Sequence, residues 1–160
     1  MNIESMANYA DVIGGIAVVV SLIYVGVQIR RNTKSSQSQA NQSAHESLAN
    51  VSLEVAKDRV FSNLTRKGMI AFDELTEEEK FQFLLLMVTV FRRFENVFYQ
   101  YKKGFLEKEL WEGYKQSMLL YFYTGGGQAF WNVRSAHFSR LFREYLDSTS
   151  PEDAKSEIET

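Results

Sequence analysis

An uncharged run of 18 residues, at positions 12–29, limits the folds open to this chain more than any other feature of the sequence. As an α-helix the run would be about 27 Å long, close to the hydrocarbon thickness of a bilayer. Soluble helices of this length usually carry a polar face, which this run lacks. We therefore predict one transmembrane helix at about residues 7–29, within a membrane anchor formed by residues 1–31.

The charges that flank this run predict its orientation. Glu4 and Asp11 precede the run, whereas Arg30, Arg31 and Lys34 follow it. A cleaved signal peptide has the opposite arrangement, with positive charge before the apolar segment and a small-residue cleavage site soon after it. Because lysine and arginine are retained in the cytoplasm, we predict a single-pass protein of the cytoplasmic (inner) membrane, with its N-terminus outside and its C-terminus in the cytoplasm.

Small residues recur along one side of the predicted transmembrane helix. Their spacing of three and four residues is that of a left-handed seam, in which small side chains let two helix backbones approach closely. The seam consists of Ala7, Ala10, Gly14, Ala17 and Ser21. Such residues are also common in membrane helices that do not pair, but their regular spacing favours an interface. We therefore predict a homo-oligomer that associates through these five positions.

Asp11 supports a second hypothesis about the same helix. In an oligomer, an acidic residue at the outer edge of the span would form a ring, as cation-selective pores require. The alternative is that Asp11 only marks where the span ends in water. The sequence thus leaves open an oligomeric channel that is lined by the N-terminal helix and has Asp11 as its pore ring.

Everything after the anchor reads as helix, so the predicted fold class is all-α. Residues 32–47 are polar and low in complexity, but they contain neither glycine nor proline. We predict that residues 32–57 are a polar stalk helix or linker, and a continuation of the transmembrane helix is the favoured form. A small helical bundle, the cytoplasmic domain, follows at residues 58–147. The acidic, proline-containing residues 148–160 are predicted to be a disordered tail.

The central helix of the bundle is predicted between a capping box and a glycine. Thr76 can accept a hydrogen bond from the backbone of Glu79, whose side chain can bond back, and Gly104 can adopt the left-handed conformation that ends helices. Apolar residues surround the first half of this segment, which makes it the core helix. Its uncharged part, residues 81–91, is too short to span a bilayer.

Shorter helices are predicted at about residues 59–71, 107–123, 129–134 and 140–146, and Ser139 is the expected cap of the last one. Three consecutive glycines, at positions 125–127, separate two of these helices. The glycines lack the lysine of a phosphate-binding loop and follow no strand. We therefore interpret them as a flexible turn that ends the preceding helix.

Little in the sequence points to catalysis or to a bound cofactor. The chain has no cysteine, which excludes disulfides, thiolate catalysis and cysteine-ligated metal sites. His45 and His137 are the two histidines, and neither has the spacing that places two ligands on one helical face. The net charge of −2 supplies no basic field for nucleic acid. We predict no catalytic, cofactor-binding or metal-binding residue and no nucleic-acid partner.

Charged residues interrupt the central apolar helix and are the best candidates for a site. Arg92 and Glu95 are three residues apart and hence neighbours on the helix surface, and Arg93 lies beside them. One interpretation is an ion pair or a set of contacts that ties this helix to Arg134 or to the stalk. The other is that these three residues form a contact site, in which an arginine meets a lipid phosphate or the carboxylate of a protein partner.

Three segments of the chain carry a family resemblance: ADVIGGIAVVVSLIYVGVQIRRNT, FRRFENVFYQYKKGFLEKELWEGY and FWNVRSAHFSRLFREYL. With them the chain resembles an uncharacterised family of small bacterial single-pass membrane proteins over most of its length. The resemblance implies a membrane anchor joined to a cytoplasmic helical domain. It implies no activity for any residue of this chain.

The leading functional hypothesis is a homo-oligomeric, membrane-anchored scaffold or interaction protein that catalyses no reaction. Its expected partners are the lipid bilayer, further copies of the chain and another protein. The first alternative is the oligomeric channel described above. The second is a membrane-bound enzyme of unknown chemistry.

Overall fold

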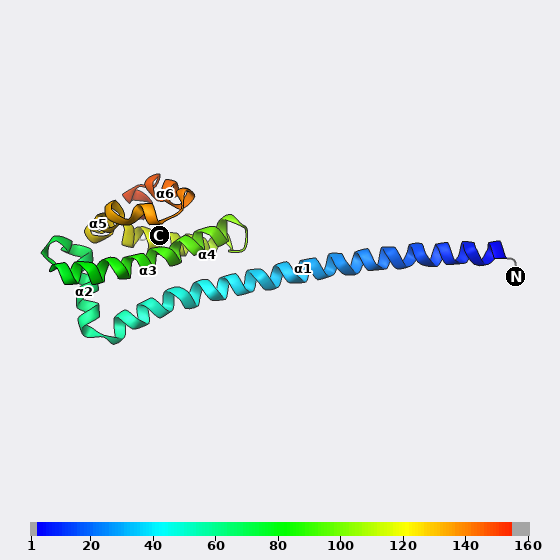
Figure 1. The fold of residues 1–160 in the computed structure, drawn as a ribbon, viewed down its shortest axis with the longest axis horizontal. Coiled ribbons are helices and arrows are strands. Elements are labelled where there is room, and N and C mark those ends of the chain that lie inside the picture. The colour runs from blue at the N-terminus through cyan, green and yellow to red at the C-terminus, as the bar shows by residue number, and fades with distance from the viewer. Residues whose placement is uncertain (1–2, 155–160) are drawn as a thin grey trace. The chain divides into compact units, whose positions relative to one another are not determined.

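The computed structural model describes the backbone of residues 3–154 and the side chains of residues 13–46 and 48–154. Over this range the chain forms six α-helices, three short 3-10 helices and no strand, which confirms the all-α prediction. The chain forms two units, Met1–Gln39 and Ala40–Thr160. Figure 1 shows the helices, and each unit is described by itself below.

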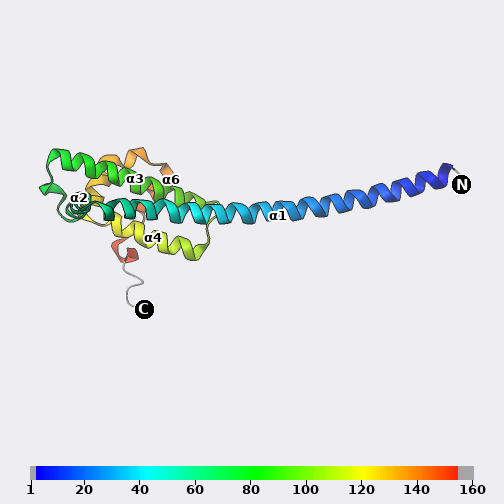
Figure 2. The same ribbon diagram turned by 90° about the horizontal axis from the view of Figure 1, so that it is seen from below.

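The first helix, α1 (Ile3–Lys57), is continuous over 55 residues, as the absence of glycine and proline from residues 32–57 predicts. Its last part, residues 40–57, belongs to the second unit. Ala44 is 1% exposed, and three partly buried residues at helical spacing pack against the core with it: Leu48, Val51 and Val55. Figure 2 shows these turns of α1 alongside α3 and α4.

The remaining helices complete the bundle. They are α2 (Arg59–Ile70), η1 (Phe72–Glu74), α3 (Glu77–Lys102), α4 (Lys108–Phe122), α5 (Gly125–Arg134), η2 (Ser135–His137), α6 (Arg140–Asp147) and η3 (Pro151–Ala154). In Figure 1, α5 and α6 lie together on one side of α3. The long central helix is α3, whose fully buried side chains include Phe83, Met87, Phe91, Phe94 and Phe98.

The ends of α3 follow the local signals in the sequence. Thr76 caps the helix through the backbone N–H of Glu79, and the Glu79 carboxylate accepts from the backbone N–H of Thr76. The backbone hydrogen bond from Thr76 lowers the pKa of Glu79. Gly104 follows the helix with a φ of 73°, a conformation that costs glycine little. Both predicted ends are thus confirmed.

The predicted disordered tail is partly wrong. Pro151–Ala154 form η3, and the side chain of Gln116 on α4 donates to the carbonyl oxygen of Asp153 over 2.9 Å. Asp153 also accepts from the backbone N–H of Ser150. These bonds hold the segment against the bundle, and Ala154 packs on the core. Residues 155–160, the rest of the predicted tail, lie outside the described residues.

The interpretation of the triple glycine as a flexible turn is also wrong. Gly125–Gly127 form the first turn of α5, which Thr124 caps by accepting from the backbone N–H of Gly127. A Cβ at Gly126 would overlap the carbonyl oxygen of Gly68 on α2, and one at Gly127 would overlap the carbonyl oxygen of Tyr121. Glycine is needed here because two backbones approach closely and leave no room for a side chain.

We expect Gly126→Ala to lower the free energy of unfolding by about 1–3 kcal/mol, because the new methyl group has no space between α5 and Gly68. The matched control is Gly113→Ala on the exposed surface of α4, where a Cβ would meet nothing within 4 Å. That change should raise the free energy of unfolding by about 0.5–1 kcal/mol through helix propensity. Denaturant unfolding followed by circular dichroism measures both, and shifts of the same sign would contradict the close approach.

Candidate functional site

The apolar part of α1 forms no contact that buries it within the described chain. Its most apolar 18-residue window has a mean hydropathy of 1.8, and none of that window is buried. Large apolar side chains between Ile13 and Ile29 are 44–67% exposed. This segment is long and apolar enough to cross a membrane, as the sequence predicts.

Three residues of the predicted oligomer seam are described, and all three are exposed on α1: Gly14, Ala17 and Ser21. A Cβ at Gly14 would meet nothing within 4 Å, so the backbone is open there. The Ser21 hydroxyl donates to the carbonyl oxygen of Ala17 over 2.8 Å and is satisfied inside its own helix. The side chains of Ala7, Ala10 and Asp11 lie outside the described residues.

The charged residues of α3 separate into a paired set and a single arginine. Arg92 donates through Nη1 to Glu95 Oε2 over 2.8 Å and through Nη2 to the carbonyl oxygen of His137 over 2.7 Å. Its guanidinium also lies 4.9 Å from the centroid of the Phe138 ring. The other carboxylate oxygen of Glu95 accepts from the backbone N–H of Ser139 over 2.7 Å. Arg92 and Glu95 therefore join α3 to the segment that leads into α6.

The contacts agree with the first sequence interpretation, in which an ion pair ties the central helix to another part of the chain. The partners, however, differ from those predicted. The contacts are made to residues 137–139 and not to Arg134 or to the stalk. Ser139 is the N-cap residue of α6, but its side chain makes no capping bond and its buried hydroxyl has no partner. The predicted cap is thus at the right residue, but the predicted bond from its side chain is not formed. Instead, Glu95, from a distant part of the chain, binds the backbone N–H of Ser139.

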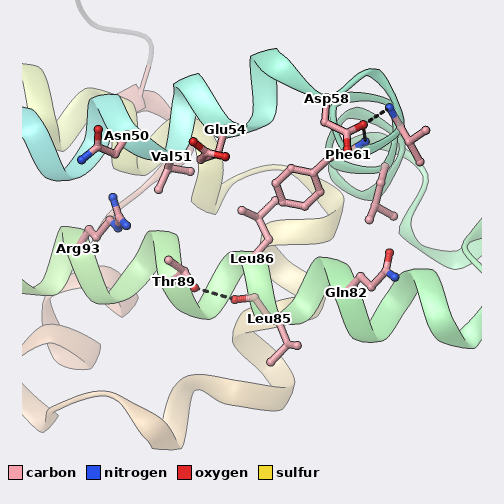
Figure 3. Close-up of a pocket in the computed structure, with 12 residues that line it drawn as sticks. Asn50, Val51, Glu54, Asp58, Phe61, Gln82, Leu85, Leu86, Thr89 and Arg93 are labelled. Atoms are coloured by element: carbon pink, nitrogen blue, oxygen red, sulfur yellow. Dashed lines mark hydrogen bonds between the residues drawn. The ribbon is translucent and has the colours of Figure 1, made fainter.

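Arg93 lies on a different side of α3, next to a groove of about 670 Å³ formed by the end of α1, α2 and α3. Figure 3 shows its side chain directed from α3 toward Asn50 and Val51 of α1, with Phe61 farther along the groove. Apolar side chains make up half of the lining: Val51, Val60, Phe61, Leu64, Leu85 and Leu86. Val60 is 78% exposed and Leu85 is 52% exposed, so the apolar surface continues to the rim.

The other charged residues of the groove already have partners. Glu54 pairs with Lys57 over 3.2 Å, and Asp58 accepts from the backbone N–H groups of Val60 and Phe61 as the cap of α2. The hydroxyl of Thr89 donates to the carbonyl oxygen of Leu85. Among the residues that the structure describes, no carboxylate lies within ion-pair distance of Arg93, and its Nη1 is buried without a hydrogen-bond partner.

The two histidines do not meet. His45 packs against the Tyr114 ring at 5.6 Å between centroids, whereas His137 lies in η2 and contributes its carbonyl oxygen to Arg92. Among the described side chains, those of residues 13–46 and 48–154, no group of three or more histidine and acidic residues is arranged to hold a metal ion.

The chain matches no family model, no curated protein and no solved structure. The resemblance to small bacterial single-pass proteins therefore stays a prediction.

The groove is the feature that the sequence reasoning missed. It is built by three helices, and its lining comes from residues 50–64 and 82–93. A signal was present, because the first half of α3 is apolar all round and cannot bury every face against a single neighbour. That signal indicates an extra contact surface, but which residues share it depends on how α2 crosses the bundle.

We expect Glu95→Ala to lower the free energy of unfolding by about 2–3 kcal/mol, because it removes the carboxylate that pairs with Arg92 and the acceptor of the backbone N–H of Ser139. Glu95→Gln should cost less, since its amide oxygen can still accept from Ser139. The control is Glu109→Ala on the exposed surface of α4, which should change stability by less than about 0.5 kcal/mol. Equal melting shifts for Glu95→Ala and Glu109→Ala would contradict the assigned contacts.

Proposed function

We propose that the chain is a single-pass membrane protein of the inner membrane that assembles with copies of itself and presents its helical bundle to a protein partner in the cytoplasm, without catalysing a reaction. The observation that carries the proposal is the unburied apolar part of α1. Eleven large apolar side chains there are exposed: Ile13, Ile16, Val18, Val19, Val20, Leu22, Ile23, Tyr24, Val25, Val27 and Ile29. Their transfer to an apolar medium is worth about 10 kcal/mol in total.

The distribution of these side chains favours a bilayer over a partner in water. Apolar residues surround the helix between positions 12 and 29, so a single partner helix would cover one side and leave the others in water. A bilayer covers every side at once. The helix also satisfies its own backbone hydrogen bonds, which a spanning segment requires.

The charge distribution supports a cytoplasmic bundle. Arg30, Arg31 and Lys34 follow the apolar segment directly, and all three are exposed on α1. No lysine or arginine precedes the segment. Positive charge on one flank is the pattern of a helix whose positive end stays in the cytoplasm.

Labelling of single cysteines tests both the insertion and the orientation, because the natural chain contains no cysteine. We expect Ser5→Cys, before the span, to react with a membrane-impermeant maleimide in intact bacterial cells. Ser117→Cys, on the exposed surface of α4, should react only after the cells are permeabilised. Reaction of neither variant in intact cells would indicate that the chain does not cross the membrane, and the reverse pattern would indicate the opposite orientation.

The seam supports self-association once the helix is in a membrane. There is little hydrophobic force between helices in lipid, so close backbone packing and hydrogen bonds must provide the attraction. Gly14 and Ala17 offer such an approach, because nothing in the described chain covers them. Because the Ser21 hydroxyl already donates to the carbonyl oxygen of Ala17, Ser21 can pack in the seam as a small residue without leaving an unpaired polar group.

We expect Gly14→Leu to reduce the cross-linked oligomer several-fold in native membranes, because a leucine side chain would hold the two backbones apart. Val19→Leu is the control, since it keeps the segment apolar and lies off the seam. Cross-linking of Gly14→Leu at the level of the parent would show that the seam is not the interface. Assembly would then have to be attributed to the bundle or abandoned.

A further inference from the structure

Arg93 is a charged group that the bundle leaves without compensation. An arginine side chain carries a permanent positive charge in proteins. The side chain is partly buried, and its Nη1 atom has neither solvent nor a hydrogen-bond partner. Buried charges are usually paired, because an isolated one loses the stabilisation that water provides. The contrast with Arg92, which has a carboxylate at 2.8 Å, shows that α3 can supply a counter-charge where it is needed.

The surface next to Arg93 is apolar and of the size of a small-ligand site. The groove volume of about 670 Å³ falls in the range of about 300–1,000 Å³ that is typical of such sites. Phe61, Leu64 and Leu86 are among its apolar lining residues. In Figure 3, Arg93 lies at one end of the groove, and Phe61 and Leu86 lie farther along it. Glu54 pairs with Lys57 and Asp58 caps α2, so Arg93 is the charged group of the lining that has no ion-pair or hydrogen-bond partner among the described residues.

We infer that this groove binds a carboxylate attached to a single apolar chain, that is, a fatty carboxylate. The carboxylate would pair with the guanidinium of Arg93, and the hydrocarbon chain would cover Phe61, Leu64 and Leu86. A guanidinium and a carboxylate match in charge and in geometry, and a neutral or cationic head group would leave Arg93 unpaired. An aromatic and aliphatic lining with few polar groups suits a chain that makes no hydrogen bonds.

An acidic helix from a protein partner is the other occupant that would match the charge. The fatty carboxylate is favoured because one positive group and a small-ligand volume are what a single-headed amphiphile requires. The site lies wholly within Ala40–Thr160, so the inference does not rest on the proposed membrane topology. If the cysteine-labelling experiment failed, the inference about the groove would be unaffected. If the groove bound no fatty carboxylate, the proposed membrane topology would be unaffected.

The test uses the full-length chain in lipid nanodiscs and a twelve-carbon carboxylic acid that carries a photoreactive diazirine at the end of its chain. We expect labelled peptides from α2 and α3, and we expect dodecanoate to compete with the label. Dodecanol and dodecyltrimethylammonium have the same chain with a neutral or a cationic head, and they should compete at least about tenfold more weakly. Equal competition by all three compounds, or labelling confined to residues 12–29, would overturn the inference, since both indicate simple partition into lipid.

Variants of the groove locate the contact. Arg93→Gln should weaken competition by dodecanoate at least about tenfold, whereas Arg93→Lys, which keeps the charge, should retain most of it. Arg66→Gln, an exposed arginine of α2 outside the groove, is the control and should have no effect. Unchanged competition in Arg93→Gln would overturn the assigned head-group contact. If the groove binds only an acidic helix, the diazirine-carrying acid will label neither α2 nor α3, and the inference will be overturned.

Two further measurements keep the inference testable if Arg93→Gln folds poorly. Leu85→Asp changes an exposed residue of the groove and places a negative charge where the chain would lie, so it should abolish labelling while the helix content stays the same. Without ligand, Arg93→Gln should raise the melting temperature by about 4 °C, because an uncompensated charge is removed. A fall in melting temperature would mean that Arg93 has a structural role within the bundle and is not held for a ligand.

Discussion

Packing of aromatic rings around α3 is the interaction on which the bundle depends. The Phe91 ring lies 5.2–6.4 Å from five other rings, which come from α3 itself, α4, α5 and the segment before α6: Phe94, Phe122, Phe130, Trp131 and Phe138. About two turns farther along α3, Phe98 contacts Trp111, Phe142 and Tyr145. Burial raises the pKa of Tyr145 to about 12. Each large ring buries much apolar area. Packing of a few rings can therefore stabilise helices as short as α5 and α6, which would not be stable in isolation.

The parts of this fold that the sequence predicted are those encoded by neighbours in the chain. The capping box at Thr76, the left-handed Gly104 and the continuity of α1 each depend on a few consecutive residues. The errors have the opposite character. The glycines at positions 125–127 read as a turn, because nothing local shows that Gly68 of another helix will approach them. Residues 151–154 read as a tail, because their bond to Gln116 spans 37 residues.

The candidate site shows the same division. Spacing alone placed Arg92 next to Glu95, but the bond from Ser139 to Glu95 spans 44 residues and could not be read from the sequence. Nothing in the pattern showed that Arg93 would lie beside a groove. Successive helical residues point about 100° apart, so one arginine faces the α6 side of α3 and the other faces the groove. The chemistry of the two is identical, and only the neighbours that the fold supplies make one structural and leave the other unpaired.

The bundle is therefore packed unevenly on its two sides. Toward α5 and α6, aromatic rings and the Glu95 bonds fill the space around α3. Toward α1 there are two separate cavities, the groove at Arg93 and a second cavity of about 190 Å³. Val51 lines both of them. The Tyr114 hydroxyl borders this second cavity and is buried without a partner, and burial raises its pKa.

Unfilled volume lowers the cost of local opening, because fewer contacts are lost when the surface moves. Of the described side chains in the last turns of α1, the small side chain of Ala44 is fully buried, and Leu48, Val51 and Val55 pack on the core while partly buried. This side of α3 can consequently admit a ligand or a partner without disturbing the aromatic core. The side held by Phe91 and Glu95 keeps the bundle folded while it does so.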